Sequence, residues 1–380
     1  MLNCEVETLI WSFVGYVRIK LCGDNIRAFF DECLKKGALF KSVACGYIIL
    51  GMIFAHTEIG NEIREALKLW AGVLIPSLFP YLVLAQYVTA SDVMDFFNPL
   101  KKALHKILNI SESGANVYLC SLISGYPTGA VCSAGLYKDR IIKKEEAERL
   151  VCFTNNAGPL FVISVVGADM LGSSGDGLAL YVIQSVSAML AGIVLGIKAP
   201  KTPYRSVRCK NRGMSLDKCT QNAINTMLAI GAFLVLACVV ARIAIISFKM
   251  VPVYGKKLSP YAKIFVYCIL EITGAMKALS EFGNTRLVFS VISSVLSWSG
   301  ICVLMQIKNV IPDEFSLSKI VGCKIVQSSV SFLLAFTYKS FFILKMSFKT
   351  DIVFTASIIM SVIIFSLFIL KSKRESYKNT

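Results

Sequence analysis

Long apolar runs separated by short polar segments are the main pattern of this chain. A helix that crosses a membrane needs about 20 mostly apolar residues. On that basis we predict membrane-spanning helices at 39–56, 69–90, 157–171, 178–197, 223–248, 287–307, 320–338 and 352–370. Residues 92–110 have the spacing of an amphipathic surface helix, and the polar segment 138–150 should lie outside the hydrocarbon. The pattern therefore predicts an all-α polytopic membrane protein.

Two further apolar stretches are interrupted by residues that break helices or carry polar groups. Residues 115–136 contain SGYPTGA, and residues 264–279 contain ILEITGA. Non-helical backbone at membrane depth is tolerated only where protein buries it or where it lines a water-filled cavity. We therefore expect both stretches to form re-entrant helical hairpins that enter the membrane and return to the same side.

The basic residues give the orientation. Loop 198–218 holds Lys198, Lys201, Arg205, Arg208, Lys210, Arg212 and Lys218 against the single acid Asp217, and the tail after Leu370 is also basic. Because Lys and Arg concentrate in cytoplasmic loops, we predict that both segments are cytoplasmic. Bases also flank SGYPTGA on its two sides, so the first hairpin should enter from the cytoplasm.

Short sequence similarities indicate an internal repeat. PYLVLAQ (80–86) is similar to AFLVLAC (232–238), YPTGA (126–130) to EITGA (271–275), and NAGPLFVIS (156–164) loosely to SGICVLMQ (299–306). The pairs occur in the same order at nearly constant spacing. An odd number of predicted crossings separates the copies, which predicts an inverted repeat. This is a common build of secondary transporters, whose sites lie near the bilayer midplane.

These patterns divide the chain into six predicted regions. They are an N-terminal extension or interfacial helix (1–38), a first transmembrane helix and loop (39–68), a first repeat (69–199), a basic cytoplasmic loop (200–220), a second repeat (221–310), and C-terminal transmembrane helices with a basic tail (311–380).

Composition supports the membrane assignment. Hydrophobic residues make up 55% of the chain and charged residues 17%, whereas soluble domains carry about 25% charged residues. Mean hydropathy is +0.65. The net charge of +16 is accounted for by cytoplasmic loops that face anionic lipids. We therefore expect the lipid bilayer as a partner and no nucleic acid.

The residues of common catalytic and metal sites are sparse. The 13 cysteines include no C-x-x-C pair, the 2 histidines lie away from the polar motifs, and no P-loop or zinc-protease motif occurs. We expect no enzyme activity and no bound cofactor. The sequence leaves open whether H⁺ or Na⁺ is a coupling ion, and whether the protein forms a homo-oligomer.

The two predicted hairpins and the helix start near residue 156 form the predicted site. Half-helix N-termini at the breaks would point their N–H groups at a bound anion. The predicted substrate-binding residues are Ser124, Gly125, Tyr126, Thr128, Gly129, Asn155, Asn156 and Thr273. Glu271 is the predicted coupling or gating residue. Placing a carboxylate at mid-membrane costs about 3 kcal/mol of free energy, so such residues usually have a function.

Several of these residues allow a second interpretation. Glu271 could form a salt bridge to Lys277 or Arg286 that fixes the hairpin. Asn155 and Asn156 could be an ordinary helix cap before Pro159. Tyr126 could stack on an aromatic ligand or simply pack at the hairpin turn.

A polar cluster lies just before the asparagine pair. Its charged residues are Glu145, Glu146, Glu148 and Arg149, which we read as a solvated helix face with a gating role as the alternative.

SGYPTGA, EEAERLVCFTNNAGPLFVISVVG (145–167) and EITGA together resemble the YlbJ-type sporulation integral membrane proteins, which carry paired nucleoside-recognition (Gate) domains. The resemblance covers roughly residues 40–370. Its motifs fall on Ser124 to Ala130, on Glu146, Glu148, Arg149, Leu150, Asn155, Asn156, Pro159, Leu160 and Phe161, and on Glu271, Thr273 and Gly274. The chain departs from the family at Trp298, Ser299 and Gly300, where a more glycine-rich turn is expected, and residues 1–36 have no counterpart.

The resemblance implies a fold similar to the hairpin-containing core of concentrative nucleoside transporters. It also implies a place in the outer forespore membrane of the mother cell and export of dipicolinic acid, a small anionic heterocyclic compound, toward the forespore. The expected function is therefore a sporulation transporter. The alternatives are a nucleoside-type transporter and a non-transporting assembly factor for the spore envelope or cortex.

Overall fold

The computed structural model describes residues 38–89, 96–197, 199–204, 215–250 and 259–343, and all regular elements in these ranges are helices. The chain divides into an N-terminal unit that ends at Gly60 and a larger unit that starts at Asn61. α3 (Ala38–Phe54) lies in the first unit, and α4 (His56–Leu69) begins there and continues into the second. Most of the predicted extension 1–38 and the predicted helix 352–370 lie outside the described residues. The loop predicted before residue 69 is the helix α4.

Four helices of the described part are long and apolar enough to cross a membrane: Ser174–Ile197, Leu216–Ser247, Arg286–Val310 and Leu317–Ser340. A pair joined by a bend, Ser42–Phe54 with His56–Leu74, raises the number to five if it is one span. Large apolar side chains such as Leu178, Leu236 and Leu287 are more than half exposed on these helices. Because soluble proteins rarely expose large apolar patches, these faces support the membrane assignment.

The larger unit contains two series of helices in a similar order. The first series is α5 (Ile75–Thr89), α6 (Asn98–Leu108), α7 (Glu112–Ser124), α8 (Thr128–Lys138), α9 (Lys144–Thr154), the π-helical η3 (Phe161–Met170) and α10 (Ser174–Ile197). The second series is α11 (Leu216–Met250), α12 (Ser259–Leu270), α13 (Ile272–Ser280), α14 (Arg286–Trp298), α15 (Gly300–Val310) and α16 (Leu317–Ile343). Apart from α6, each element of the first series has a counterpart in the second.

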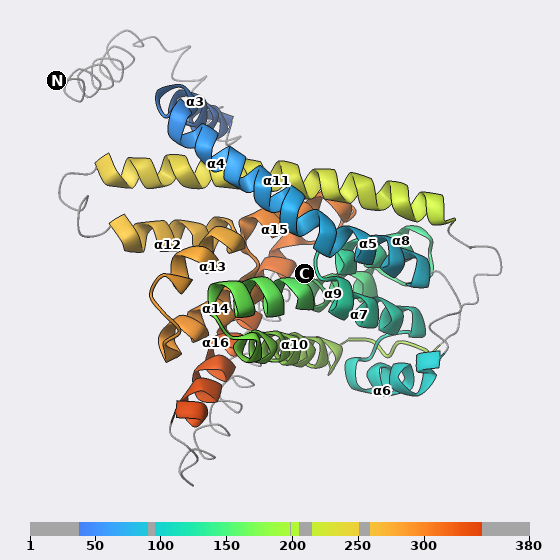
Figure 1. Ribbon diagram of the computed structural model, residues 1–380. Coiled ribbons are helices and arrows are strands. Elements are labelled where there is room, and N and C mark those ends of the chain that lie inside the picture. Colours follow the sequence, from blue (N-terminus) through green and yellow to red (C-terminus); the bar gives the residue numbers. More distant parts are fainter. Residues whose placement is uncertain (1–37, 90–95, 198, 205–214, 251–258, 344–380) are drawn as a thin grey trace, which may run out of the picture. The chain divides into compact units, whose positions relative to one another are not determined.

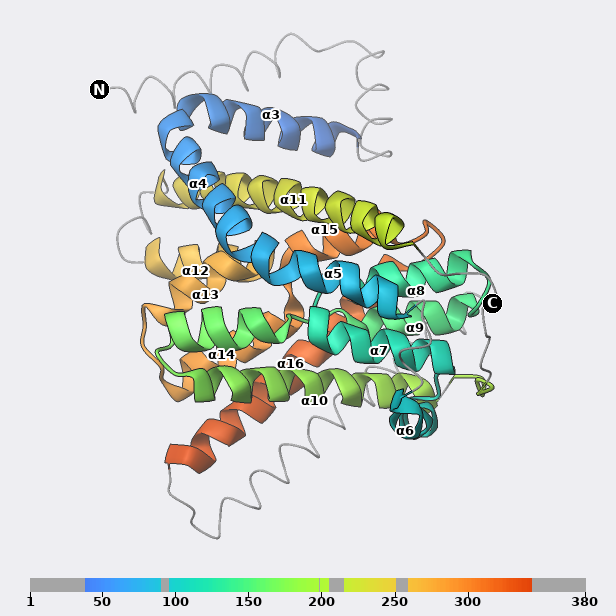
Figure 2. The same cartoon turned by 45° about the vertical axis from the view of Figure 1, so that its right-hand side comes forward.

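Two helix pairs, α7–α8 and α12–α13, occupy equivalent places in the two series. Figures 1 and 2 show the first helix pair near one end of α11 and the second helix pair near its other end. α8 packs against α15, whereas α13 packs against η3; likewise α9 contacts α16, and α14 contacts α10. The contacts between the series are therefore reciprocal.

The sequence similarities fall at equivalent positions in the two series. Segments 80–86 and 232–238 lie within α5 and α11, and segments 126–130 and 271–275 lie at the breaks of the two helix pairs. Segments 156–164 and 299–306 begin just before η3 and α15, respectively.

Local sequence explains several helix boundaries. Ser111 is the N-cap of α7, where its Oγ accepts a hydrogen bond from the Gly114 N–H at 3.1 Å. Thr285 caps α14 in the same way through the Val288 N–H at 3.3 Å. Short hydroxyl side chains are favoured at this position because they satisfy the free N–H groups of the first turn.

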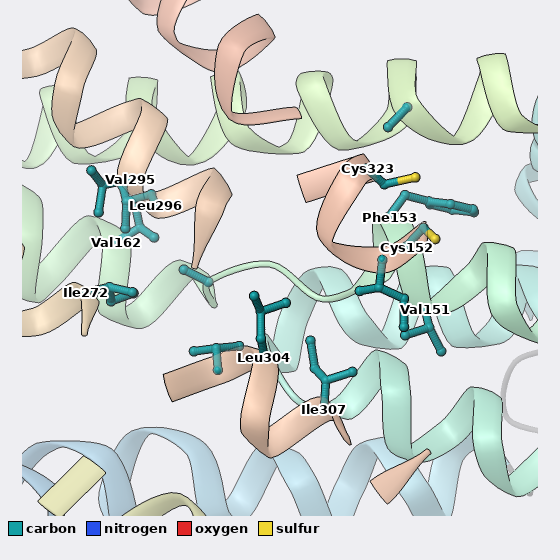
Figure 3. Packing of buried hydrophobic residues seen from close by; sticks show 14 of the residues in the cluster. Val151, Cys152, Phe153, Val162, Ile272, Val295, Leu296, Leu304, Ile307 and Cys323 are labelled. Carbon is teal, nitrogen blue, oxygen red and sulfur yellow. The ribbon is translucent and has the colours of Figure 1, made fainter. Parts of the chain in front are cut away.

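Both series contribute to one hydrophobic core. Figure 3 shows Val162 of η3 beside Val295 and Leu296 of α14, and Phe153 of α9 near Cys323 of α16. The core therefore joins the helices that follow the first helix pair to those that follow the second.

Two sequence predictions differ from the structure here. The helix predicted at 287–307 corresponds to the candidate span Arg286–Val310, but it is interrupted at Ser299, which has a left-handed φ of 71° and separates α14 from α15. The solvated face predicted at 145–149 is wrong for two acids. Glu146 and Glu148 are 7% and 8% exposed.

Long-range hydrogen bonds explain the burial of these acids. Glu146 accepts the Ser111 N–H at 2.6 Å. Glu148 accepts the Ser316 N–H at 2.9 Å and pairs with Lys319 at 3.1 Å. Both carboxylates thus stabilise loops of other segments, which local spacing does not reveal.

Candidate functional site

The first helix pair breaks at Gly125, Tyr126 and Pro127. Gly125 has a φ of 76°, and a Cβ at this position would lie 2.5 Å from the Gly158 nitrogen. The Tyr126–Pro127 peptide bond is cis. Only glycine fits the positive φ of residue 125 and its close approach to Gly158. The turn therefore lies directly against residues 155–158, the non-helical segment between α9 and η3, which we call the first link.

The second helix pair breaks at Glu271. This residue is 4% exposed, and its carboxylate accepts the N–H groups of Thr273 at 2.8 Å and Gly274 at 2.6 Å. Glu271 is therefore the N-cap of α13. The N–H groups of the first turn have no acceptor within the helix, so they stabilise negative charge at this position.

A second link, Ser299 and Gly300, lies against this break. Gly300 has a φ of 77°, and a Cβ there would lie 3.0 Å from the Leu270 carbonyl oxygen. In each series, a glycine after a broken helix thus lies close to the turn of a helix pair.

The breaks of both helix pairs line one cavity of about 30 Å³. Most of its lining is apolar and comes from η1 (Trp70–Leu74), α5, α11 and α15. Tyr126, Glu271, Thr273 and Gln306 supply the main polar groups, and Glu271 is the only charged residue of the described lining. A cavity of this size holds about one or two water molecules.

The structure brings part of the predicted site together at this cavity. Tyr126, Glu271 and Thr273 line it. The other residues predicted from the first motif, which are Ser124, Gly125, Thr128 and Gly129, build the turn behind Tyr126. Ser124 Oγ donates to the Cys120 carbonyl, and a Cβ on Gly129 would overlap Thr154 Oγ1. The role of these residues in substrate binding stays a prediction.

Asn155 and Asn156 do not cap the helix that follows, because both side chains bond to other segments. Asn155 accepts the Ala130 N–H at 2.9 Å and donates to the Val151 carbonyl at 2.7 Å. Asn156 donates to the Phe153 carbonyl at 2.8 Å and accepts from Gln327 at 2.7 Å. The capping interpretation is therefore wrong for η3, and the two amides instead hold the first link between α8, α9 and α16.

The salt bridge considered for Glu271 is not formed among the described residues. Arg286 donates to Ser340 at 3.3 Å and lies 4.4 Å from the centre of the Phe336 ring. The carboxylate of Glu271 instead bonds to the first turn of its own helix. The coupling or gating role stays a prediction.

Sequence reasoning missed three buried polar side chains, Gln306, Lys324 and Gln327. Gln306 lines the cavity and is 4% exposed, and its Oε1 has no hydrogen-bond partner. Lys324 and Gln327 are 0% exposed within α16 and bond to the first link. A polar residue in a predicted span is the signal that identified Glu271, and the same rule points to these residues.

Tyr267 supports the break of the second helix pair. Its hydroxyl donates to Glu62 Oε1 of α4 at 2.6 Å, and its carbonyl accepts the Glu271 N–H at 2.8 Å. A Cβ on Gly274 would lie 2.5 Å from the Tyr267 ring. The glycine is therefore needed for α13 to pack against this ring.

The described residues contain no cluster of three or more His, Cys, Asp or Glu side chains with the spacing of a metal site. The identity of a coupling ion stays open.

The chain is 23% identical over 296 aligned residues to the sporulation integral membrane protein YlbJ of Bacillus subtilis (strain 168), an alignment that covers 69% of this chain and 72% of that protein. No family model and no solved structure matches the chain. The similarity to YlbJ and the apolar helices together support an integral membrane protein that is similar to YlbJ.

Proposed function

We propose that the protein is a secondary transporter for a small anionic aromatic or heterocyclic compound. The substrate implied by the YlbJ-type resemblance is dipicolinic acid, moved across the outer forespore membrane. The observation that carries the proposal is that Tyr126 and Glu271, from helix breaks far apart in the sequence, line one cavity. Broken helices that place polar groups among apolar helices are typical of transporter sites.

The arrangement of helices supports an inverted repeat. The two series share their order, the helix pairs lie near opposite ends of α11, and α8–α15 and α13–η3 are reciprocal contacts. In this proposal the helix pairs are re-entrant hairpins that enter from opposite sides of the membrane, and the nucleoside-recognition fold describes each repeat.

The size of the cavity bears on the transport cycle. A cavity of about 30 Å³ is too small for a pyridine ring with two carboxylates. In this proposal the cavity belongs to a closed state of the transporter. Movement of one hairpin away from the cavity would open the site to one side, and movement of the other would open it to the opposite side.

Glu271 has a specific role in this proposal. A carboxylate in the cavity lining repels an anionic substrate, and the repulsion disappears when the carboxylate binds a proton or a cation. Glu271 would thus couple substrate binding to uptake of a positive ion, for which a proton is the simplest candidate.

The proposal is tested with purified protein in liposomes and radiolabelled dipicolinate. We expect uptake by the unmodified protein, loss of its pH dependence in Glu271→Gln, and at least about tenfold slower uptake in Tyr126→Ala, a loss of about 1.4 kcal/mol of binding or activation energy. Asp313→Asn, in an exposed loop, is the matched control. Absence of uptake by a stable, folded protein would overturn the proposal.

The assembly-factor alternative is separated in sporulating cells. Cells that carry Tyr126→Ala at a normal protein level should form spores low in dipicolinate, and addition of the compound to the medium should restore the spores. Normal dipicolinate would contradict transport, and failure of the added compound to rescue would favour the assembly factor.

One observation favours the nucleoside-type alternative. The described lining of the cavity contains no Lys or Arg, and a neutral substrate needs none. Competition by a nucleoside, measured against dipicolinate uptake, would decide between the two substrate classes.

A further inference from the structure

Lys324 is a lysine buried within α16. The residue is 0% exposed, although α16 is one of the helices apolar enough to cross a membrane. None of the ion pairs in the described part of the chain includes Lys324. A buried ammonium group without a carboxylate partner is costly, and a protonated Lys324 has no carboxylate in the described part of the chain to balance its charge.

The partners of Lys324 favour the charged form. Its Nζ donates to the carbonyl oxygen of Asn155, to Asn156 Oδ1 at 3.2 Å and to Gln327 Oε1 at 3.3 Å. A protonated lysine has three N–H donors and no acceptor. Three acceptors around the nitrogen therefore match the ammonium group, and two of the three belong to the first link.

The first link carries donors that have no partner. In the part of the chain that the structure describes, the backbone N–H groups of Asn156, Ala157 and Gly158 donate no hydrogen bond, and all three residues are buried. The buried hydroxyl of Thr128, at the adjacent turn, also has no partner. Buried N–H groups are almost always paired in folded proteins, so this local excess of donors favours an acceptor ligand.

The link also connects this charge to the cavity. Gly158 lines the cavity, and Asn156, which bonds to Lys324, lies two residues before it. Two residues span at most about 7 Å of chain. The positive charge therefore acts across the backbone of the first link, although Lys324 does not line the cavity.

We propose that Lys324 and the first link form the anion-selective end of the transport site. A carboxylate of the substrate accepts hydrogen bonds from the free N–H groups of the link, and Lys324 balances its charge from behind. The inference rests on the proposed transport function and names the feature that sets its substrate class. It also accounts for anion binding by a cavity whose lining has no cation.

The test compares two probes of nearly the same shape, dipicolinate and its neutral diamide, whose binding to purified protein is measured by competition and by thermal stabilisation. The unmodified protein should prefer dipicolinate. Lys324→Met should weaken dipicolinate binding about tenfold, which corresponds to one charge–charge interaction over about 10 Å at an effective dielectric constant of about 20. Diamide binding should not change.

Two further variants separate charge from structure. Gln327→Glu places a carboxylate beside an intact Lys324, so it should reproduce the loss of dipicolinate preference if charge is the cause. Lys319→Met removes a more exposed lysine from the same helix and should leave the preference unchanged. If Lys324→Met does not fold, the Gln327→Glu result decides.

The outcomes distinguish this inference from the proposed function. Unchanged dipicolinate preference in Lys324→Met or in a folded Gln327→Glu would overturn the role of Lys324, even if transport is confirmed. Failure of the unmodified protein to bind or move either probe would overturn the proposed function itself.

Discussion

The first and second links follow equivalent helices but are held in different ways. Residues 155–158 are held by hydrogen bonds to other segments, because Asn155 accepts from the Ala130 backbone N–H and Asn156 accepts from the Gln327 side chain. The second link depends on local backbone conformation, with positive φ at both Ser299 and Gly300. Two series of helices with a similar order therefore break a helix in different ways, one with long-range hydrogen bonds and the other with a local left-handed turn.

The largest expected effect concerns the turn that lies on the first link. Gly125→Ala forces a Cβ to within 2.5 Å of the Gly158 nitrogen at a φ of 76°, so we expect a loss of about 4 kcal/mol in the free energy of unfolding. Gly135→Ala, in α8, meets no atom within 4 Å and should be neutral or slightly stabilising. Thermal unfolding in detergent measures both variants, and equal stability of the two would contradict the packing described.

The side chains that hold each link provide the second comparison. Asn155→Ala leaves the buried Ala130 N–H and Val151 carbonyl without this amide, which should cost about 3 kcal/mol. Ser299→Ala removes only one long hydrogen bond, to the Leu296 carbonyl at 3.3 Å, and should cost less than about 1 kcal/mol. Denaturant titration of both variants would show whether side-chain hydrogen bonds stabilise the first link more than the second, and a larger loss in Ser299→Ala would reverse this conclusion.

Substitution of the two link glycines should destabilise the protein more at the second link than at the first. Gly300→Ala introduces a Cβ at a φ of 77° and 3.0 Å from the Leu270 oxygen, with an expected loss of about 2 kcal/mol. A Cβ on Gly158 would lie 3.3 Å from the Ser124 carbonyl oxygen, and this residue has no positive φ. We therefore expect Gly158→Ala to lower the free energy of unfolding by less than about 1 kcal/mol. A larger loss for Gly158→Ala, measured by the same titration, would contradict local control of the second link.

The smallest effect is expected outside both links, in the loop between α15 and α16. Lys308 lies 2.7 Å from the fully exposed Asp313 and lowers the pKa of this carboxyl below its ordinary value of 3.8. The ion pair therefore contributes fully to the stability of the folded protein only at pH values above the ordinary pKa of this carboxyl. The contribution is lost as the pH falls through the lowered pKa. Because exposed ion pairs are weak, Asp313→Asn should unfold at the same temperature as the unmodified protein at pH 7, and a clear shift would contradict this.

The apolar pattern predicts much of the fold. Uninterrupted runs with distinct polar borders correspond to α10, α11 and α16. The turns at Gly125 and Glu271 are predicted because glycine, proline and a carboxylate stand out in apolar sequence. The apolar pattern does not predict the break at Ser299, because a single left-handed serine in an apolar run leaves the pattern nearly unchanged; only the family resemblance indicates a turn at this position.

The candidate site is only partly predictable for a related reason. Tyr126 and Glu271 are identified because each lies in a visible interruption, and they line the same cavity. The burial of Glu146 depends on a hydrogen bond to Ser111, and the position of Lys324 depends on Asn155. Such contacts join residues far apart in sequence, so local patterns indicate that a group is unusual but not what it touches.

The hydrogen bond between Tyr267 and Glu62 has a mechanical consequence. It ties α12 to α4, a helix that starts in the N-terminal unit and continues into the larger one. Any swing of the second helix pair must either break this bond or pull α4 along. A displacement of α4 at Glu62 is thereby transmitted to the helix that leads into Glu271.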